Sequence, residues 1–386
     1  MSTFPISLFS KQKTPFYYYD RGLLDRTLDA VDASIAGTPV RMHYAIKANA
    51  NPEILRIIAS RGYGADCVSG NEIKLAIECG FKPESIYYAG VGKTDEEILT
   101  GIDSGIGCFN IESLEEIDIL AALATQRGRK VTVALRVNPD IDAHTHHYIT
   151  TGLKENKFGI DLTLLDEAIS RVLNHSCLDL GGLHFHIGSQ ITINEPFRIL
   201  SQRIDEIITK YRESKGIVFR FINAGGGLGI DYDNPDLHPI SDFDGYIKAL
   251  TEHLVLAKGQ ELHCELGRAI VGQCGSLISK VVLVKKGLNK DFVVIDAGMS
   301  DLLRPALYGA HHKIENITAT GKPADRIYDV VGPICESSDT FGRDEHLPET
   351  HRGDLIAIRS AGAYGEAMAS RYNLRDLPSF LFHSPS

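Results

Sequence analysis

The sequence predicts an α/β fold, a (β/α)8 TIM-like barrel, followed by a C-terminal β-rich domain built as a small β-barrel or sandwich. Short apolar runs alternate with segments of helical periodicity from about residue 40 to residue 270, as in parallel α/β folds. After Val271 the chain changes to runs rich in Val and Ile, separated by Gly, Pro and charged turns. Its 386 residues suit one large domain and a smaller one.

Eight apolar runs are the expected strands of the barrel, and periodic segments between them are the expected helices. The strands are predicted at residues 42–46, 63–68, 86–90, 107–111, 130–137, 182–187, 219–224 and 261–266. Helices are predicted at residues 53–60, 71–79, 112–124, 162–173 and 197–211. Eight strands over this length match the roughly 250 residues of a typical (β/α)8 barrel. An open doubly wound sheet is the structural alternative.

The second domain is predicted from four further strands. These lie at residues 276–285, 292–295, 327–331 and 355–359. The expected division is a barrel over residues 25–270 and a β-rich domain over residues 271–386, which the N-terminal segment 1–24 joins through a strand at 16–19. The residues after Leu377 are expected to be poorly ordered.

Composition favours a globular protein that binds neither nucleic acid nor a membrane. The net charge is -10, and no cluster of Lys and Arg is long enough to follow a phosphate backbone. Seven scattered cysteines form no C-x-x-C pair, which favours a reducing compartment. Residues 1–20 contain no apolar leader, and no window approaches 18 uninterrupted apolar residues. We therefore expect a cytoplasmic protein.

Lys47 follows the first apolar run, where a strand would deliver its amine into a pocket. In a (β/α)8 barrel the active site is built from the carboxyl ends of the strands. We expect Lys47 to be buried there, because desolvation lowers the pKa of a lysine and leaves more neutral amine to attack a carbonyl and form a Schiff base. Taken alone, the nonapeptide 41–49 favours an ordinary lysine pointing into water.

Polar residues follow the other predicted strands as well. Asp66 and Ser69 lie at the second strand, Asn138 at the fifth and Glu265 at the eighth. His184 and His186, at the sixth strand, are two residues apart and share a face, a spacing that could hold a metal ion. Metal-dependent hydrolases of this architecture carry such a pair on their first strand, so we expect no metal site.

A glycine run at the seventh strand suits a phosphate. Successive backbone N–H groups of Gly225, Gly226 and Gly227 can converge on phosphate oxygens, although a tight turn with positive φ is the alternative. A dinucleotide fingerprint starting at Gly225 fails, because it requires Gly or Ala where Ile230 stands. Glu265, on the neighbouring strand, could keep the ring nitrogen of pyridoxal phosphate protonated, although alone it would be read as part of an ion pair.

Seven motifs, in order and over nearly the whole chain, resemble the diaminopimelate decarboxylase family of fold type III pyridoxal-phosphate enzymes. They are YAIKAN at 44–49, HIGSQ at 186–190, GGGLG at 225–229, ELGR at 265–268, RPALY at 304–308, GPICES at 332–337 and GAY at 362–364. The family usually has proline where this chain has Leu266. That change affects local rigidity and leaves Glu265 and Arg268 in place.

The resemblance implies a role for each matching residue. Lys47 would hold pyridoxal 5'-phosphate, His186 would stack on its ring, Glu265 would pair with the ring nitrogen and Asp66 would position the assembly. The expected phosphate contacts come from Ser189, Gly225, Gly226, Gly227, Gly267, Arg268 and Tyr364. The expected substrate contacts come from Arg268, Arg304, Tyr308, Glu336 and Tyr364. Cys335, which with Lys47 completes the catalytic pair, is the expected proton donor, and Cys335 and Glu336 would be supplied across a homodimer interface.

The expected reaction is decarboxylation of meso-2,6-diaminopimelate to L-lysine and CO2, the last step of lysine biosynthesis. Arg304 with Tyr308 favours a substrate with a second amino-carboxylate, and the polar segments 138–146 and 157–159 resemble the same branch. Carboxynorspermidine decarboxylase, or another basic amino-acid decarboxylase of this fold, is the runner-up. A protein that only binds the cofactor would lack the second domain.

Overall fold

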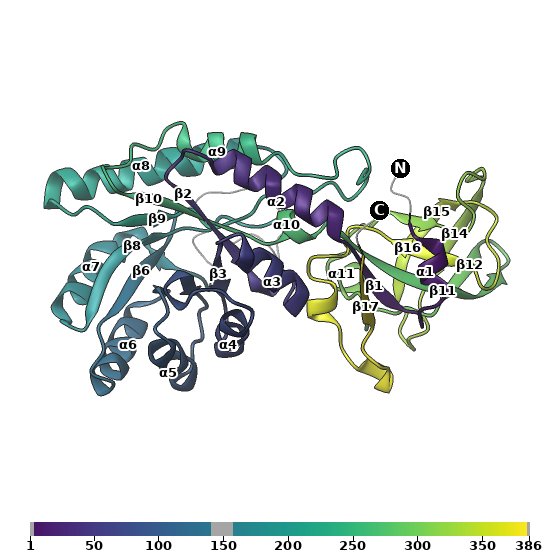
Figure 1. Cartoon of the computed structure of the whole chain (residues 1–386), viewed down its shortest axis with the longest axis horizontal. Coiled ribbons are helices and arrows are strands. Elements are labelled where there is room, and N and C mark those ends of the chain that lie inside the picture. Colours follow the sequence, from purple (N-terminus) through teal and green to yellow (C-terminus); the bar gives the residue numbers. More distant parts are fainter. Residues whose placement is uncertain (1–3, 140–156, 384–386) are drawn as a thin grey trace. The chain divides into compact units, whose positions relative to one another are not determined.

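The computed structural model describes residues 4–139 and 157–383 (Figure 1). The chain divides into two compact units. The barrel unit comprises residues 30–229 and 242–267, and the β unit comprises residues 1–29, 230–241 and 268–386. The domain limits expected from the sequence, residues 25–270 for the barrel and 271–386 for the β-rich domain, remain a prediction. The polar segment at 140–146, which resembles the diaminopimelate branch, lies outside the described residues.

The barrel unit is a closed parallel barrel of eight strands. They are β2 (Val40–Ala45), β3 (Gly64–Cys67), β4 (Ile86–Tyr88), β5 (Cys108–Ile111), β6 (Val131–Asn138), β8 (Leu178–His184), β9 (Phe221–Asn223) and β10 (Glu261–Leu266). Each strand pairs in parallel with the next, and β10 pairs with β2 to close the barrel. A two-residue strand, β7 (Ile160–Asp161), pairs with β6. The prediction of a barrel is confirmed, and the alternative of an open doubly wound sheet is wrong.

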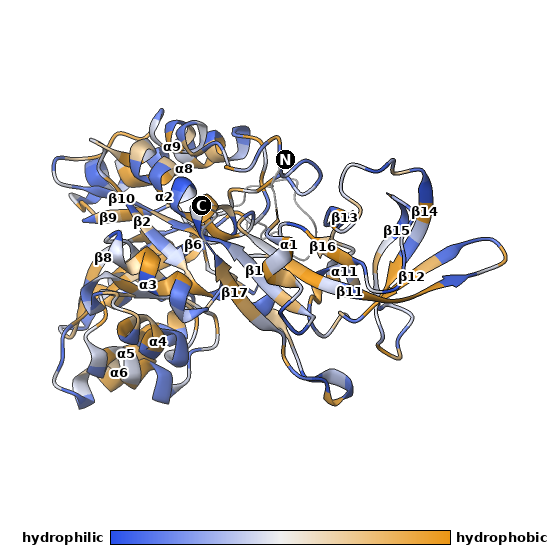
Figure 2. Ribbon diagram, turned by 45° about the vertical axis from the view of Figure 1, so that its right-hand side comes forward, coloured by the Kyte–Doolittle hydropathy of each residue, from blue (hydrophilic) through white to orange (hydrophobic). Residues whose placement is uncertain are grey.

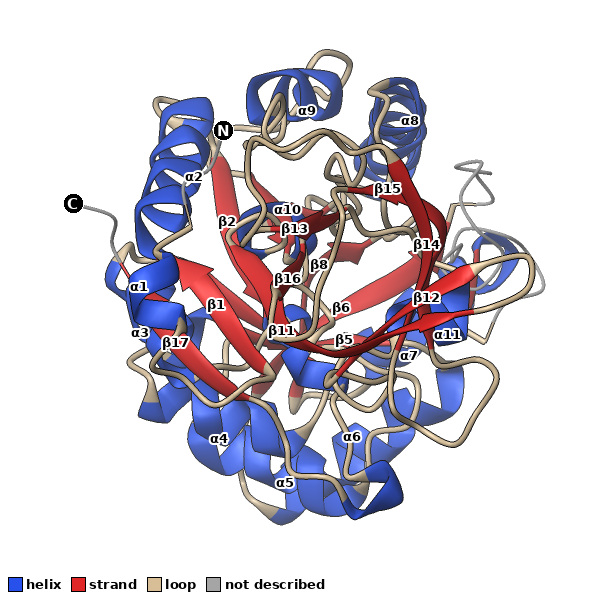
Figure 3. Ribbon diagram, turned by 90° about the vertical axis from the view of Figure 1, so that its right-hand side faces the viewer, coloured by secondary structure: helices blue, strands red, loops and turns tan. Residues whose placement is uncertain are grey.

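Helices alternate with these strands and lie outside them (Figure 3). They are α2 (Arg21–Ile35), which starts in the β unit, α3 (Pro52–Ser60), α4 (Gly70–Glu78), α5 (Asp95–Ser104), α6 (Leu114–Gln126), α7 (Leu165–Asn174), α8 (Glu195–Lys215) and α9 (Phe243–Thr251). Capping residues determine where some of these helices begin. Asn51 caps the N-terminus of α3, and Thr94 forms a capping box with Glu97 at the N-terminus of α5. The helices are mixed in hydropathy, as helices that cover a barrel should be (Figure 2). None of the described helices could cross a membrane.

The β unit is a mostly antiparallel sheet. Its main path runs β13 (Ile314–Asn316), β16 (Leu355–Ile358), β11 (Gly275–Lys286), β12 (Asp291–Ile295), β14 (Arg326–Val331) and β15 (Thr340–Leu347). The N-terminal strand β1 (Phe16–Asp20) pairs antiparallel with β11. Two short helices, α10 (Arg268–Val271) and α11 (Arg304–Tyr308), carry arginines discussed below.

The expectation of a poorly ordered tail was wrong. Residues 379–383 form a further strand, β17 (Ser379–His383), which runs parallel to β1 with Phe16 opposite Ser379. Two successive side chains explain the order. The ring of Phe382 lies 5.7 Å from that of Tyr19, and Leu381 packs against a cluster that includes Phe16 and Tyr18. Partial burial of these apolar groups helps to offset the entropy of ordering the tail.

Candidate active site

Lys47 stands directly after the first barrel strand, in the 3₁₀ turn η1 (Ile46–Ala48). Ile46 and Ala48 are fully buried, but the side chain of Lys47 is 41% exposed, so the expectation of a buried lysine was wrong. The reason is local, because the strand ends at Ala45 and Lys47 lies in the turn that follows it. The Tyr44 hydroxyl donates to the Asn49 carbonyl at 2.9 Å and ties the turn together.

Asp66 is a buried carboxylate that pairs with Lys47. It lies on β3 opposite Ala45 of β2, and its Oδ2 accepts from Lys47 Nζ at 3.3 Å. The side chain is almost completely buried. Burial raises the pKa of the Asp66 carboxyl to about 6; Glu265 adds to this rise and Lys47 opposes it. Its second oxygen, Oδ1, has no hydrogen-bond partner among the described residues.

Glu265 lies on β10, and its pKa is shifted in the opposite direction to that of Asp66. Asn223 Nδ2 donates to its Oε1 at 2.6 Å, and its Oε2 lies 3.1 Å from His184 Nε2. Burial alone would raise the pKa of the Glu265 carboxyl, but His184, Lys47 and the Asn223 hydrogen bond together lower it well below its usual range. The pKa values of two buried carboxyls are thus shifted in opposite directions, raised for Asp66 and lowered for Glu265. Such a pair of shifts is typical of catalytic sites.

The two histidines after β8 have different partners. Because Glu265 is ionised and can only accept, the Nε2 of His184 carries a proton, and its buried Nδ1 has no partner within the described chain. His186 Nδ1 accepts from the Gly226 amide at 3.3 Å. Burial lowers the pKa of His186, helped by the positive charge of Arg136, so His186 is neutral. Across residues 4–139 and 157–383, no group of three His, Cys, Asp or Glu could hold a metal ion.

The glycine run follows β9 and touches neighbouring backbone closely. A Cβ on Gly226 would lie 1.9 Å from the Glu265 carbonyl oxygen, and one on Gly225 would lie 2.3 Å from that of Phe185. Gly225 and Gly227 have positive φ, at 69° and 116°. The Gly225 amide already donates to Asn223 Oδ1 at 2.9 Å.

The remaining predicted residues of the barrel unit lie near these strand ends. Ser189 lies in the loop after β8, two residues before Ile191, which bridges to Leu228 beyond the glycines. Gly267 packs against the Lys47 turn, because a Cβ there would lie 2.8 Å from that of Ala48. Leu266, which replaces the usual proline, is buried in β10 opposite Tyr44.

Two predicted arginines of the β unit share a tyrosine that sequence reasoning missed. Arg268 Nη1 donates to the Tyr232 hydroxyl at 2.6 Å and Arg304 Nη1 donates to the same oxygen at 2.8 Å. Both arginines are only 6% exposed. Tyr364 has a left-handed backbone, with φ at 57°, and its ring centre lies 4.9 Å from the Arg268 guanidinium. Tyr308 ends α11 and is half-buried.

Cys335 and Glu336 lie in the loop between β14 and β15, and both are exposed. The Tyr372 hydroxyl donates to Glu336, and the Cys335 amide donates to Asn373 Oδ1 at 3.3 Å. All seven cysteines fall in the described chain, and each is a free thiol.

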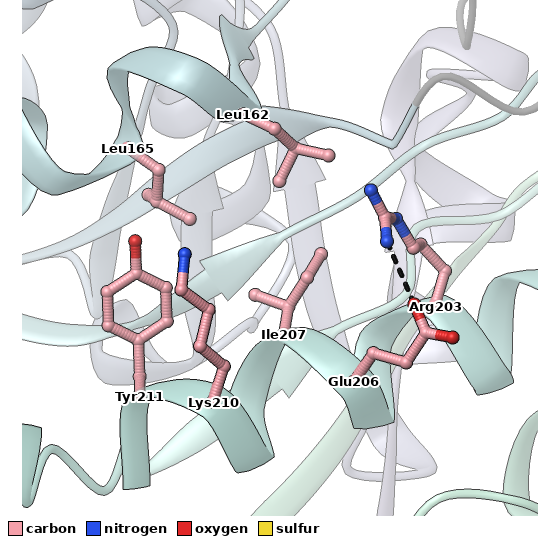
Figure 4. A pocket seen from close by; sticks show the side chains of 7 residues that line it. All are labelled: Leu162, Leu165, Arg203, Glu206, Ile207, Lys210 and Tyr211. Atoms are coloured by element: carbon pink, nitrogen blue, oxygen red, sulfur yellow. Dashed lines mark hydrogen bonds and ion pairs between the residues drawn. The ribbon is translucent and has the colours of Figure 1, made fainter. Parts of the chain in front are cut away.

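A pocket lies elsewhere, between helix α8 and the segment that holds Leu162 and Leu165 at the start of α7 (Figure 4). Helix residues line it: Leu162, Leu165, Arg203, Glu206, Ile207, Lys210 and Tyr211. None of the site residues predicted from the sequence is among them, so this pocket is separate from the strand-end constellation.

Comparisons with known proteins show the family of this chain. Residues 21–272 match the family model described as "Pyridoxal-dependent decarboxylase, pyridoxal binding domain". The chain is therefore a pyridoxal-phosphate-dependent decarboxylase. The chain is 53% identical to diaminopimelate decarboxylase of Bacteroides thetaiotaomicron, over 97% of each chain. It is 43% identical to the Helicobacter pylori enzyme of that name, over 95% of this chain and 90% of the relative.

A solved structure extends the likeness to three dimensions. Diaminopimelate decarboxylase from Helicobacter pylori complexed with L-lysine superimposes with a TM-score of 0.91 and 41% identity, covering 98% of this chain and 93% of that one. The chain belongs to the diaminopimelate decarboxylase family.

Proposed function

We propose that this enzyme decarboxylates meso-2,6-diaminopimelate to L-lysine with release of carbon dioxide, the last step of lysine biosynthesis. The observation that carries the proposal is the pair of differently tuned acids, Asp66 and Glu265, beside Lys47 in a barrel of this family. The names of the close relatives, and the lysine bound to one of them, support the choice of substrate.

The residues fit pyridoxal phosphate. Asp66 Oδ1 and His184 Nδ1 are buried polar atoms without partners in the described chain, and close contacts leave room only for glycine at positions 225 and 226. When bound, pyridoxal phosphate supplies an acceptor for the electron pair left on the substrate Cα after carbon dioxide departs. Lys47 provides the amine that binds the cofactor covalently.

Glu265 keeps the cofactor ring protonated in this proposal. Its low pKa makes it a full negative charge at every working pH, and its two donors fix its direction. His186 presents a neutral ring for stacking. Asp66 holds the amine of Lys47 in reach of the cofactor.

We propose that the phosphate is bound by Ser189, by the amides of Gly227, Gly267 and Arg268, and by the Tyr364 hydroxyl. Gly225 and Gly226 contribute their lack of a side chain, because their amides already donate to Asn223 and to His186. A backbone cradle binds phosphate without a competing side chain, which suits the close contacts found at the glycines.

Arg304 supports a substrate that carries a second carboxylate. Within the described chain its hydrogen bonds go to Tyr232 and His312, and it forms no ion pair with Asp or Glu. A buried guanidinium without a counter-ion is costly, so an anionic substrate group would be stabilising there. Arg268, Tyr308 and Tyr364 are proposed as further substrate contacts. Carboxynorspermidine, which carries one amino-acid head, is the second candidate substrate.

The residues after β14 complete the proposal. Cys335 is proposed to return the proton to Cα, and Glu336 to bind the distal amino group, both reaching the site of a second copy in a homodimer. The homodimer and the cytoplasmic location remain predictions from the sequence.

The direct test is an absorbance scan of purified protein with pyridoxal phosphate, followed by addition of meso-diaminopimelate and assay of lysine and carbon dioxide. A visible cofactor band with lysine released is the expected result. A coloured protein that turns over carboxynorspermidine but not diaminopimelate would shift the assignment to the second candidate. A protein that binds no pyridoxal phosphate would contradict the assignment altogether.

A further inference from the structure

His312 is a fully buried histidine of the β unit, outside the set of proposed site residues. Its Nε2 lies 2.9 Å from Nη1 of Arg304, and its Nδ1 lies 2.8 Å from the carbonyl oxygen of Arg359. A guanidinium can only donate and a carbonyl can only accept. The proton therefore sits on Nδ1, and Nε2 is the acceptor. The surroundings fix one neutral tautomer of this ring.

Arg304 is held by neutral groups alone. Its Nη1 donates to His312 and to the Tyr232 hydroxyl, and its guanidinium lies 4.9 Å from the centre of the Tyr232 ring. Over the chain as described, no carboxylate pairs with it. Its positive charge is thus oriented without being neutralised.

Arg359, which also contacts His312, shows the contrast. Its guanidinium pairs with Glu315 Oε2 at 2.6 Å and with Asp236 Oδ1 at 2.9 Å. The same part of the β unit therefore contains Arg359, whose charge is neutralised by two carboxylates, and Arg304, whose charge no described carboxylate neutralises. An anionic ligand could pair with Arg304. An acid in place of His312 would fix Arg304 equally well but would compete with an incoming carboxylate.

Tyr232 adds a second point of attachment. Its hydroxyl oxygen accepts from both Arg304 and Arg268, and its ring lies edge-on to His312 with 5.0 Å between centres. One oxygen therefore sets the separation of two guanidinium groups. Such a fixed pair suits the two oxygens of a carboxylate.

We propose that His312 and Tyr232 are positioning residues that hold Arg304 as the receptor for the substrate carboxylate remote from the reacting carbon, and so select dicarboxylic substrates. This proposal rests on the proposed function. It makes substrate specificity depend on two residues that themselves make no hydrogen bond to the substrate.

Two substitutions of His312 separate positioning from folding. His312→Asn places an amide N–H where Nδ1–H lies and keeps the bond to Arg359, but it removes the acceptor for Arg304. His312→Gln reaches the position of Nε2 with its amide oxygen and restores that acceptor. The neighbouring His311, an exposed residue paired with Asp233, gives the matched control His311→Asn.

We expect His312→Asn to raise the KM for meso-diaminopimelate about tenfold, with kcat within about threefold of wild type, because one oriented hydrogen bond to a charged group is lost. Binding of L-lysine, followed by its effect on Tm or by calorimetry, should weaken about as much. Binding of cadaverine, which lacks the carboxylate, should not change. His312→Gln should recover most of the loss, and His311→Asn should match wild type.

The outcomes are distinguishable. A wild-type protein that ignores diaminopimelate contradicts the proposed function. A wild-type protein that decarboxylates it, with an unchanged KM in His312→Asn, overturns the positioning role alone, as does a parallel fall of Tm and activity in both His312 variants. If His312→Asn does not fold, Tyr232→Phe replaces it, since it removes only the hydroxyl; the same selective loss of lysine binding is expected, and its absence overturns the proposal.

Discussion

Asp66 and Glu265 are both buried, yet their pKa values move in opposite directions. Glu265 receives two hydrogen bonds from Asn223 and His184, whereas one oxygen of Asp66 receives none from the described residues. Asp66 therefore carries a poorly compensated charge above its pKa of about 6. Such strain is common at sites that trade stability for function.

Replacing Asp66 by Asn should stabilise the cofactor-free protein at neutral pH. The carboxyl has a pKa of 3.8 in the unfolded chain and about 6 in the folded one, so wild type loses stability as pH rises between these values. Asn avoids this loss, and its advantage in free energy of unfolding should reach about 2–3 kcal/mol above pH 6. Urea unfolding at about pH 4.5 and pH 7.5 measures it. An advantage that does not grow with pH would refute the role assigned to burial.

Glu265→Gln should separate catalysis from cofactor binding. The amide is close in size to the carboxylate and still has an oxygen to accept from a neighbour, but it cannot compensate a protonated ring nitrogen. We expect kcat to fall about 100- to 1000-fold, as for the loss of one electrostatic contact in a buried site. Steady-state kinetics at saturating cofactor measures this, and cofactor affinity within a few-fold of wild type is the control. An unchanged kcat would remove Glu265 from the mechanism.

At the scale of elements, the glycine run joins β9 to the rest of the site through backbone contacts. Gly226→Ala would force a methyl group against the Glu265 carbonyl and should cost about 1–3 kcal/mol. It should also weaken pyridoxal phosphate binding at least about tenfold, because the cradle and β10 move together. Fluorescence or absorbance titration with the cofactor gives the affinity.

Gly216 offers the matched control for this substitution. It ends α8 with φ of 65°, and a methyl group added there would meet no other atom within 4 Å. Gly216→Ala should cost about 1 kcal/mol through backbone strain and leave cofactor affinity unchanged. Equal losses of affinity in both variants would show a general effect of lower stability.

Strand β17 yields a test of its own. Truncating the chain after Leu377 removes the strand that pairs with β1, together with the ring contact between Phe382 and Tyr19. We expect Tm to fall by several degrees, about what a loss of 1–2 kcal/mol produces in a large domain. Differential scanning calorimetry measures it. An unchanged Tm would mean that the strand contributes little.

The predictable elements were those with a strong local signal. The barrel strands, buried on both faces, appear in sequence as apolar runs, and all eight were found. Strand β15 has the largely polar sequence TFGRDEHL and gave no such run, and the three apolar residues of β17 (SFLFH) are too short a run to predict a strand. Tyr232 was not predicted as a site residue because its partners Arg268 and Arg304 are 36 and 72 residues away in the chain. The exposure of Lys47 depends on a turn that periodicity does not encode.

At the scale of the whole molecule, the proposed homodimer with shared sites predicts complementation. Lys47→Ala and Glu336→Ala should each be nearly inactive as separate proteins. Mixed and reassorted, about half of the dimers would pair one of each, and each of these has one intact site, so about a quarter of wild-type activity should return. Activity of the mixture, with light scattering to give the mass, tests this. A mixture no more active than its components would contradict shared sites.

The pairing of β1 with β17 also constrains how the protein is made. The pairing of Phe16 with Ser379 cannot form until the ribosome has added another 363 residues (379 − 16) after Phe16. At ribosomal rates of about 5–20 residues per second, this is roughly 20–70 s. For most of that time β1, with four of its five side chains destined for burial, also lacks its other neighbour, because β11 ends only at Lys286. The nascent chain is therefore expected to expose an apolar edge until β17 has been synthesised, and to need protection from aggregation until then.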